Sequence, residues 1–230
     1  MPAFDLLTGS GFGSLLGMRH ALEPDHVAAV STLISGERSS RRAAWLGLCW
    51  GLGHTASLLV AGAVLIVLRA EMPPSVTSAF ELAVAFMLVG LGMRAIAQAA
   101  RQGPDGPATE HRHGPFVHRH PSGAAHVHIG RWTLARRPLL VGALHGLAGS
   151  GTLTALVLST LPTTTARVAY LALFGVGSTL SMAAMSGLLG WPLARLGANH
   201  AVGRGLSLLV VCATTVLGLA WGYPIVARWL

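Results

Sequence analysis

The chain has 230 residues, of which 52% are hydrophobic and only 10% are charged, and its mean hydropathy is +0.60. This balance excludes a soluble globular domain and predicts a polytopic membrane protein in contact with the lipid bilayer. All 16 basic residues are arginine, and the net charge is +8. In a soluble protein that charge would indicate nucleic acid binding, but here the arginines flank apolar segments. No nucleic acid partner is therefore expected, and the arginines are interpreted as topology signals.

Six apolar segments are long enough to cross a bilayer as helices. The connections between them are short, except for one polar connection at residues 101–136. The sequence therefore predicts an all-α membrane protein with six transmembrane helices. The six segments cover residues 8–34, 43–68, 76–100, 137–161, 166–191 and 203–228.

The arginines are concentrated on one side of the predicted membrane. The connections after the first, third and fifth segments contain twelve arginines with their flanks, whereas the opposite side contains three, at positions 69, 167 and 228. Arginine is enriched in cytoplasmic loops, so the long connection is predicted to be cytoplasmic and both termini to be outside. We expect multi-pass insertion in a bacterial plasma (inner) membrane. The twelve are Arg38, Arg41, Arg42, Arg94, Arg101, Arg112, Arg119, Arg131, Arg136, Arg137, Arg195 and Arg204.

The two halves of the chain carry similar short sequences. Residues 15–20 match residues 140–145 at Leu, Gly and His, and residues 51–57 match residues 175–181 at four of seven positions. Each half has an odd number of segments, so the halves would enter the membrane in opposite senses, as in the inverted repeats of secondary transporters. The predicted organisation is a first three-helix repeat at 1–100, a His-rich cytoplasmic loop at 101–136, and a second three-helix repeat at 137–230.

The first apolar segment carries an unusual group of ionisable residues near its middle. Such groups usually face a cavity and mark an ion or substrate path. His20, Asp25 and His26 offer the nitrogen and oxygen ligands that suit nickel, cobalt or zinc. On an unbroken helix, Asp25 and His26 would lie about 140° and about 240° around the axis from His20. Pro24 has no N–H for the His20 carbonyl and its ring clashes with that group, so the helix must kink or unwind and can bring the three side chains together.

Other polar residues lie within the apolar segments. His54 is the only ionisable residue near the middle of the second segment, and we predict it as a further ligand or as a partner that supports one. His145 begins a glycine-rich run in the fourth segment, and it could complete the site, orient a ligand through a hydrogen bond, or be purely structural. Glu23, Thr55 and Ser178 are weaker candidates for residues that support the ligands. No catalytic residue is predicted.

The long polar connection is rich in histidine. Between residues 110 and 128, six histidines form three His-x-His pairs, a pattern typical of metal binding. Large apolar residues are few there, so the segment is expected to be disordered without metal and to bind divalent metal weakly beside the inner mouth. The six are His111, His113, His118, His120, His126 and His128.

The run from His20 to His26, His-Ala-Leu-Glu-Pro-Asp-His, resembles the His-x4-Asp-His signature of the nickel/cobalt transporter superfamily. Leu52-Gly-His-Thr resembles the Leu-Gly-His-Ser/Thr signature of the same superfamily, and the run from His145 to Ser150 is similar to its six-span, urease-accessory-type branch. The resemblance implies Ni²⁺ or Co²⁺ as the transported substrate, with no prosthetic group. It also implies His20, Asp25 and His26 as metal-recognition residues, with His54 supporting them.

The resemblance leaves the direction of transport open. Uptake is the first interpretation, and a nickel/cobalt efflux permease is an alternative, because Leu-Glu-Pro and a His-rich loop also occur in such exporters. A non-transporting protein that delivers metal for urease assembly is a third interpretation, and a cytoplasmic metallochaperone would then be a partner. A membrane metallohydrolase would be expected to carry a helical His-Glu-x-x-His motif, and the chain has none.

Overall fold

The computed structural model describes most of the apolar segments and part of the polar connection. Within the connection, at residues 109–134, the description covers the backbone alone. The described residues are 12–35, 37, 39–68, 72–101, 109–113, 116–120, 126–129, 132–148, 161, 163–196 and 200–229.

The first apolar segment is broken in the middle, as Pro24 predicts. Residues 12–20 are helical, residues 21–23 form a turn, and helix α2 (Pro24–Leu33) begins with the proline in its first turn. Glu23 is extended, with φ −63° and ψ 147°, which is the conformation favoured before proline. The Glu23 N–H donates to the His20 carbonyl at 3.0 Å, so the turn satisfies the acceptor that Pro24 cannot reach.

Four long helices follow the pattern of apolar segments: α3 (Ser40–Leu68), α4 (Pro74–Arg101), α7 (Thr164–Leu196) and α8 (His200–Ala227). Among the described residues, these four are long and apolar enough to cross a membrane. The chain is therefore a multi-pass membrane protein. Helix α5 (Arg136–Ala148) covers only the first part of the predicted fourth segment, and residues 149–160 lie outside the described residues. The count of six spans stays a prediction.

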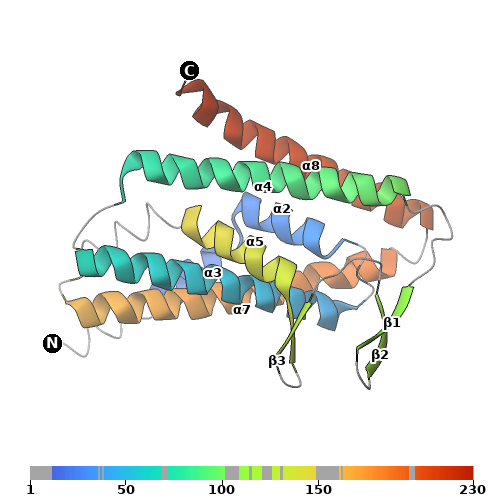
Figure 1. Ribbon diagram of the computed structural model, residues 1–230, viewed down its shortest axis with the longest axis horizontal. Helices are drawn as coiled ribbons and strands as arrows, with labels where there is room; N and C mark the ends of the chain where they lie inside the picture. Colours follow the sequence, from blue (N-terminus) through green and yellow to red (C-terminus); the bar gives the residue numbers. More distant parts are fainter. Residues whose placement is uncertain are drawn as a thin grey trace.

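The helices lie in three tiers, with α4 and α8 above, α2 and α5 in the middle, and α3 and α7 below (Figure 1). Helix α3 packs against α7 and α5, α4 packs against α8, and the short helix α2 contacts α8, α4 and α7. Apolar side chains including Val30, Trp50, Leu88 and Met182 are buried between these helices. This core includes Ala21 and Ala29, which lie on either side of Pro24 at the break in the first segment.

Helices α3 and α7 approach closely because glycines face side chains on the opposite helix. A β-carbon at Gly51 would lie 2.7 Å from the Thr179 Cα, and a β-carbon at Gly175 would overlap the Thr55 side chain. Thr55 donates to the Gly175 carbonyl at 2.9 Å, and its hydroxyl lies 2.8 Å from that of Thr179. Small residues and hydroxyl bonds of this kind are the usual means of joining helices in a membrane.

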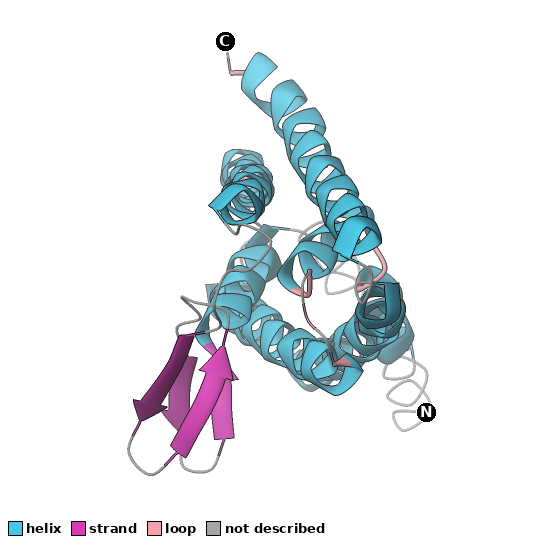
Figure 2. Cartoon of the chain, turned by 90° about the vertical axis from the view of Figure 1, so that its right-hand side faces the viewer, coloured by secondary structure: helices cyan, strands magenta, loops and turns pink. Residues whose placement is uncertain are grey.

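The connection at 101–136 contains two antiparallel hairpins, where the sequence predicts no regular structure. The first joins β1 (Thr109–His113) to β2 (Phe116–His120), and the second joins β3 (His126–Ile129) to β4 (Trp132–Ala135). In the sequence, two residues that begin with glycine separate the strands of each pair, and the strands contain aromatic and β-branched residues, which favour pairing. The hairpins project to one side of the helices (Figure 2).

Candidate metal centre

Five ionisable side chains meet in the middle tier of the helices. His20 ends the helical residues 12–20, Asp25 and His26 lie in the first turn of α2, His54 lies within α3, and His145 lies within α5. All five are buried: His20 is 5% exposed, Asp25 2%, and the other three 0%. Four separate helical segments therefore contribute to one buried cluster.

The break in the first segment brings His20 next to α2. The ring centroids of His20 and His26 are 4.4 Å apart, although an unbroken helix would place these residues about 240° apart around its axis. His54 joins them from α3, with its Nε2 atom 3.1 Å from His20 Nε2. One ligand atom from each of His20, His26 and His54 lies within 4.8 Å of the others, which is close enough to hold a metal ion.

Asp25 connects His26 to His145. His26 Nδ1 lies 3.1 Å from Asp25 Oδ1, and His145 donates from Nε2 to Asp25 Oδ2 at 2.9 Å. The ring centroids of His26 and His145 are 4.4 Å apart. Asp25, His26 and His145 form a second group whose ligand atoms lie within 4.8 Å of one another. The sequence leaves three roles open for His145: a ligand, a residue that orients a ligand, or a structural histidine. The structure shows that His145 contacts the Asp25 carboxylate within the cluster.

Several polar atoms in the cluster have no hydrogen-bond partner among the described residues. They are His26 Nε2, His54 Nδ1, His145 Nδ1 and the indole nitrogen of Trp50. A buried polar atom without a partner costs about 1–3 kcal/mol, so the protein is destabilised unless a ligand satisfies these atoms. Imidazole nitrogen and carboxylate oxygen suit nickel, cobalt and zinc. The donor set therefore fits a divalent transition metal.

The weaker candidates from the sequence divide into two groups. Glu23 lies beside the cluster, with Oε2 3.0 Å from His20 Nδ1. Thr55 instead bonds to α7 through Thr179 and Gly175, and the Ser178 hydroxyl lies 3.9 Å from the Met182 sulfur. Glu23 is therefore placed to orient a ligand, whereas Thr55 joins two helices and Ser178 packs within α7.

Two aromatic residues beside the cluster escape sequence reasoning. The centroid of the Trp50 ring lies 5.3 Å from that of His26 and 5.7 Å from that of His145. The ring centroids of Phe174 and His20 are 5.4 Å apart. The sequence feature that could have indicated Trp50 is its position one helical turn before His54. Phe174 lies 124 residues after Trp50, which is the offset between the halves, so the repeat could have indicated it as well.

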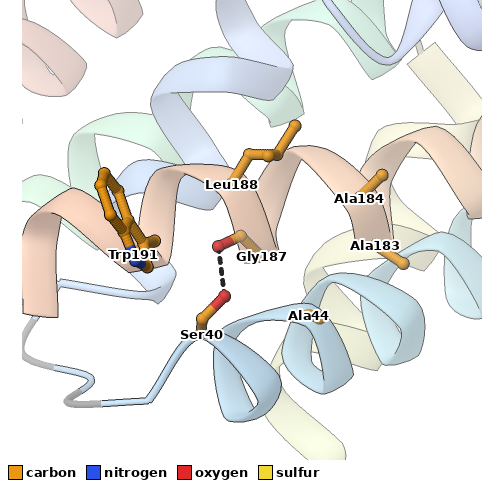
Figure 3. A pocket seen from close by; sticks show the side chains of 7 residues that line it. All are labelled: Ser40, Ala44, Ala183, Ala184, Gly187, Leu188 and Trp191. Atoms are coloured by element: carbon orange, nitrogen blue, oxygen red, sulfur yellow. Dashed lines mark hydrogen bonds between the residues drawn. The ribbon is translucent and has the colours of Figure 1, made fainter.

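A separate open groove lies between α3 and α7, where Ser40 donates to the Gly187 carbonyl at 2.6 Å (Figure 3). Its lining contains no histidine, cysteine or carboxylate, so it offers no ligand set for a transition metal. The lining residues are Ser40, Ala44, Ala183, Ala184, Gly187, Leu188 and Trp191.

The loop histidines lie in the paired strands of the two hairpins. His111 is opposite His118 in the register of β1 and β2, and His128 is opposite Thr133 in β3 and β4. The structure describes only the backbone of these residues, so their role in metal binding stays a prediction. They lie outside the helical segments that carry the buried cluster.

These features define a class: a multi-pass helical membrane protein with a buried cluster of metal-type ligands at a broken helix. The chain belongs to the high-affinity nickel-transport protein family (NicO), whose model matches residues 10–220. This is a family of nickel-transport membrane proteins, so the prediction that the chain is not an enzyme is confirmed.

Among curated proteins, the chain is similar to the urease accessory protein UreH of Bacillus sp. (strain TB-90). The two are 30% identical over 223 residues, which cover 97% of this chain and 94% of that protein. The chain is also similar to two Arabidopsis thaliana proteins named Chloroplast protein FOR GROWTH AND FERTILITY 1 and 2, at 28% and 26% identity over 80% and 81% of this chain. It spans about half the length of each, 50% and 48%. No solved structure is significantly similar to the chain.

Proposed function

We propose that the protein carries Ni²⁺ or Co²⁺ across a bacterial plasma membrane, in the direction of uptake, through the cluster of His20, Asp25, His26, His54 and His145. One observation supports this proposal above the others: around a break between two half-helices, buried imidazole nitrogens have no hydrogen-bond partner among the residues that the structure describes. Broken helices near the middle of the membrane commonly form the binding sites of transporters. Membership of a nickel-transport family supports the choice of cargo.

The cluster is suited to hold an ion that has lost most of its water. Nitrogen and oxygen atoms from the protein replace water ligands, and the surrounding core keeps bulk water out. Asp25 and Glu23 orient His26, His145 and His20 by hydrogen bonds, as metal-bound imidazoles usually require.

The proposed architecture is a pair of inverted repeats, and reciprocal contacts between the halves support it. A β-carbon at Gly17 would overlap the Phe174 carbonyl oxygen, and one at Gly142 would overlap the Trp50 carbonyl oxygen. Gly142 follows Gly17 by 125 residues, and Phe174 follows Trp50 by 124, so each contact is the counterpart of the other. The contacts of Gly51 with Thr179 and of Gly175 with Thr55 are related in the same way.

The same relation extends to the cluster. His20 of the first half lies beside Phe174 of the second half, and His145, 125 residues after His20, lies beside Trp50 of the first half. Helices α3 and α7 are antiparallel, since Gly47 faces Ser186 whereas Gly62 faces Leu171. Antiparallel counterparts are required if the second half enters the membrane in the opposite sense. The two halves would then rock against each other around the shared cluster.

The orientation follows from the arginines and leads to a labelling prediction. The hairpins and the start of α3 lie at one end of the helices, and the starts of α4 and α7 lie at the other (Figure 1). In a Cys212→Ser background, which removes the exposed native thiol, we expect Ser122→Cys to react with a membrane-impermeant maleimide only after the cells are opened. Thr164→Cys should react in intact cells. Labelling of both positions from the same side would contradict the inverted repeat.

Uptake is tested by radiolabelled Ni²⁺ in cells grown in metal-poor medium, with and without the gene. Under the proposal, expression raises cellular Ni²⁺ in proportion to the amount of protein in the membrane. A fall in cellular Ni²⁺ would show efflux instead.

A metal-delivery role is the second candidate, and the similarity to a urease accessory protein favours it. A delivery protein would pass nickel to a cytoplasmic metallochaperone or to a urease assembly complex without carrying it across the membrane. The purified protein in liposomes separates the two functions, because a transporter moves external Ni²⁺ into the vesicle lumen with no partner present. Bound Ni²⁺ without entry would favour delivery.

We include the loop histidines in the proposal as an auxiliary metal-binding segment. Three His-x-His pairs beside the arginine-rich ends of the helices would raise the local metal concentration at the cytoplasmic mouth.

A further inference from the structure

The buried cluster contains two sets of metal ligands that share one histidine. His20, His26 and His54 form the first set, and Asp25, His26 and His145 form the second. Each set has three ligand atoms within 4.8 Å of one another. His26 belongs to both.

A shared histidine makes the two sets mutually exclusive. A neutral imidazole has one N–H donor and one lone pair, so His26 can bind only one ion at a time. Its Nδ1 atom lies 3.1 Å from Asp25 Oδ1, and its Nε2 atom has no partner among the described residues. In this arrangement Nδ1 donates to the carboxylate, and the lone pair of Nε2 is free for metal.

Asp25 has a different role depending on which set holds the ion. When the first set is filled, Asp25 accepts hydrogen bonds from His26 and His145 and orients them. When the second set is filled, Asp25 must itself bind the ion. The first set then consists of three neutral nitrogens, whereas the second has two nitrogens and a negative oxygen, so the atoms that contact the ion differ in charge and in type.

The two sets also differ in one histidine that lies on opposite halves of the proposed repeat. His20 is specific to the first set and His145 to the second, and these histidines correspond at an offset of 125 residues. Inverted halves face opposite sides of a membrane, so corresponding positions are displaced in opposite directions along the path. His26 contacts both, since its ring centroid lies 4.4 Å from that of His20 and 4.4 Å from that of His145.

We infer that the protein has two successive metal sites, one formed by His20, His26 and His54 and the other by Asp25, His26 and His145, and that a single ion passes between them while His26 remains bound. This inference rests on the proposed function, because it divides the transport path into two positions. It assigns His145 as a ligand of the second site.

The test uses the full-length protein in detergent or lipid nanodiscs, with Co²⁺ as a spectroscopic probe. Its visible absorption depends on the number and type of ligands, so a site of three nitrogens and a site with a carboxylate differ in spectrum. His54→Ala removes a ligand of the first site only, His145→Ala removes one of the second site only, and His26→Ala affects both. The same substitution at His200, the first residue of α8, is the control for loss of one imidazole.

We expect wild type to bind one Co²⁺ per chain. His54→Ala and His145→Ala should each still bind one Co²⁺, within about 10-fold of the wild-type affinity, but with two different spectra and without transport in liposomes. His26→Ala should weaken binding by at least about 100-fold, since it removes a ligand from both sites. Thermal unfolding of each variant shows whether it is folded.

Two results would overturn the inference and still be compatible with metal transport by the protein. If His145→Ala transports Ni²⁺ at the wild-type rate, the second site is not on the path. If folded His54→Ala and His145→Ala both lose Co²⁺ binding altogether, the five residues form a single site. Failure of wild type to bind or to move metal would instead contradict the proposed function itself.

Discussion

Replacing His26 or Asp25 by alanine is expected to abolish Ni²⁺ and Co²⁺ transport, and His20→Ala is expected to do the same. His26 lies in both sets of candidate ligands, and Asp25 forms hydrogen bonds with two histidines. The Nε2 atom of His20 lies 3.1 Å from that of His54. Even residues that only orient metal ligands change metal affinity by about 10–100-fold when replaced. We therefore expect a loss of at least about 100-fold in uptake of radiolabelled Ni²⁺ for each variant.

The controls separate loss of ligands from loss of folding. Asp25→Asn keeps the size of the side chain but removes its charge, and it should resemble Asp25→Ala if the carboxylate is the functional group. His200→Ala should transport normally. The amount of each variant in the membrane is measured on immunoblots. Normal transport by the variants at 20, 25 and 26, at wild-type amounts, would rule out this cluster as the path.

The second large effect is expected at the glycines where the halves meet. A β-carbon at Gly53 would overlap the Leu139 carbonyl oxygen, and one at Gly177 would overlap the Ser14 carbonyl oxygen. In each case the obstacle is backbone, which cannot rotate away. We expect Gly53→Ala and Gly177→Ala each to destabilise the protein by about 1–3 kcal/mol, the usual cost of overpacking. Thermal unfolding of the purified variants measures this effect.

Gly90 provides the matched control, because a β-carbon there would meet no atom of the described residues within 4 Å. Alanine is favoured over glycine inside a helix, so Gly90→Ala should leave the stability unchanged or raise it by about 0.5–1 kcal/mol. The positions Gly53 and Gly177 correspond at an offset of 124 residues. Similar destabilisation at both would support the repeat, and a large effect at only one would argue against equivalent packing in the two halves.

The amino-acid sequence by itself determined the class of protein and the location of the helix break. Apolar length predicts bilayer-spanning helices because unpaired backbone groups cannot be exposed to lipid. Pro24 determines the break because it lacks the N–H that the His20 carbonyl needs, and this property is local to the chain. The candidates His20, Asp25 and His26 could therefore be chosen from seven consecutive residues.

The sequence was less informative about the connection at 101–136. Its low apolar content predicts no regular structure, yet the structure places two hairpins there. Short turns that begin with glycine and strands with aromatic and β-branched residues can form local pairs without a large core. Composition averages over such local patterns, so it did not reveal them.

Only the tertiary structure decided which distant residues join the cluster. His145 of α5 contacts Asp25 of α2 across 120 residues of chain, and the position of α5 depends on its close packing against α3 at glycines such as Gly53, Gly142 and Gly146. The structure also placed Trp50 and Phe174 beside the histidines, and it separated Thr55 from them by turning its hydroxyl toward α7. Helix periodicity says which face a residue occupies, but the partner of that face is determined by packing between segments far apart in the chain.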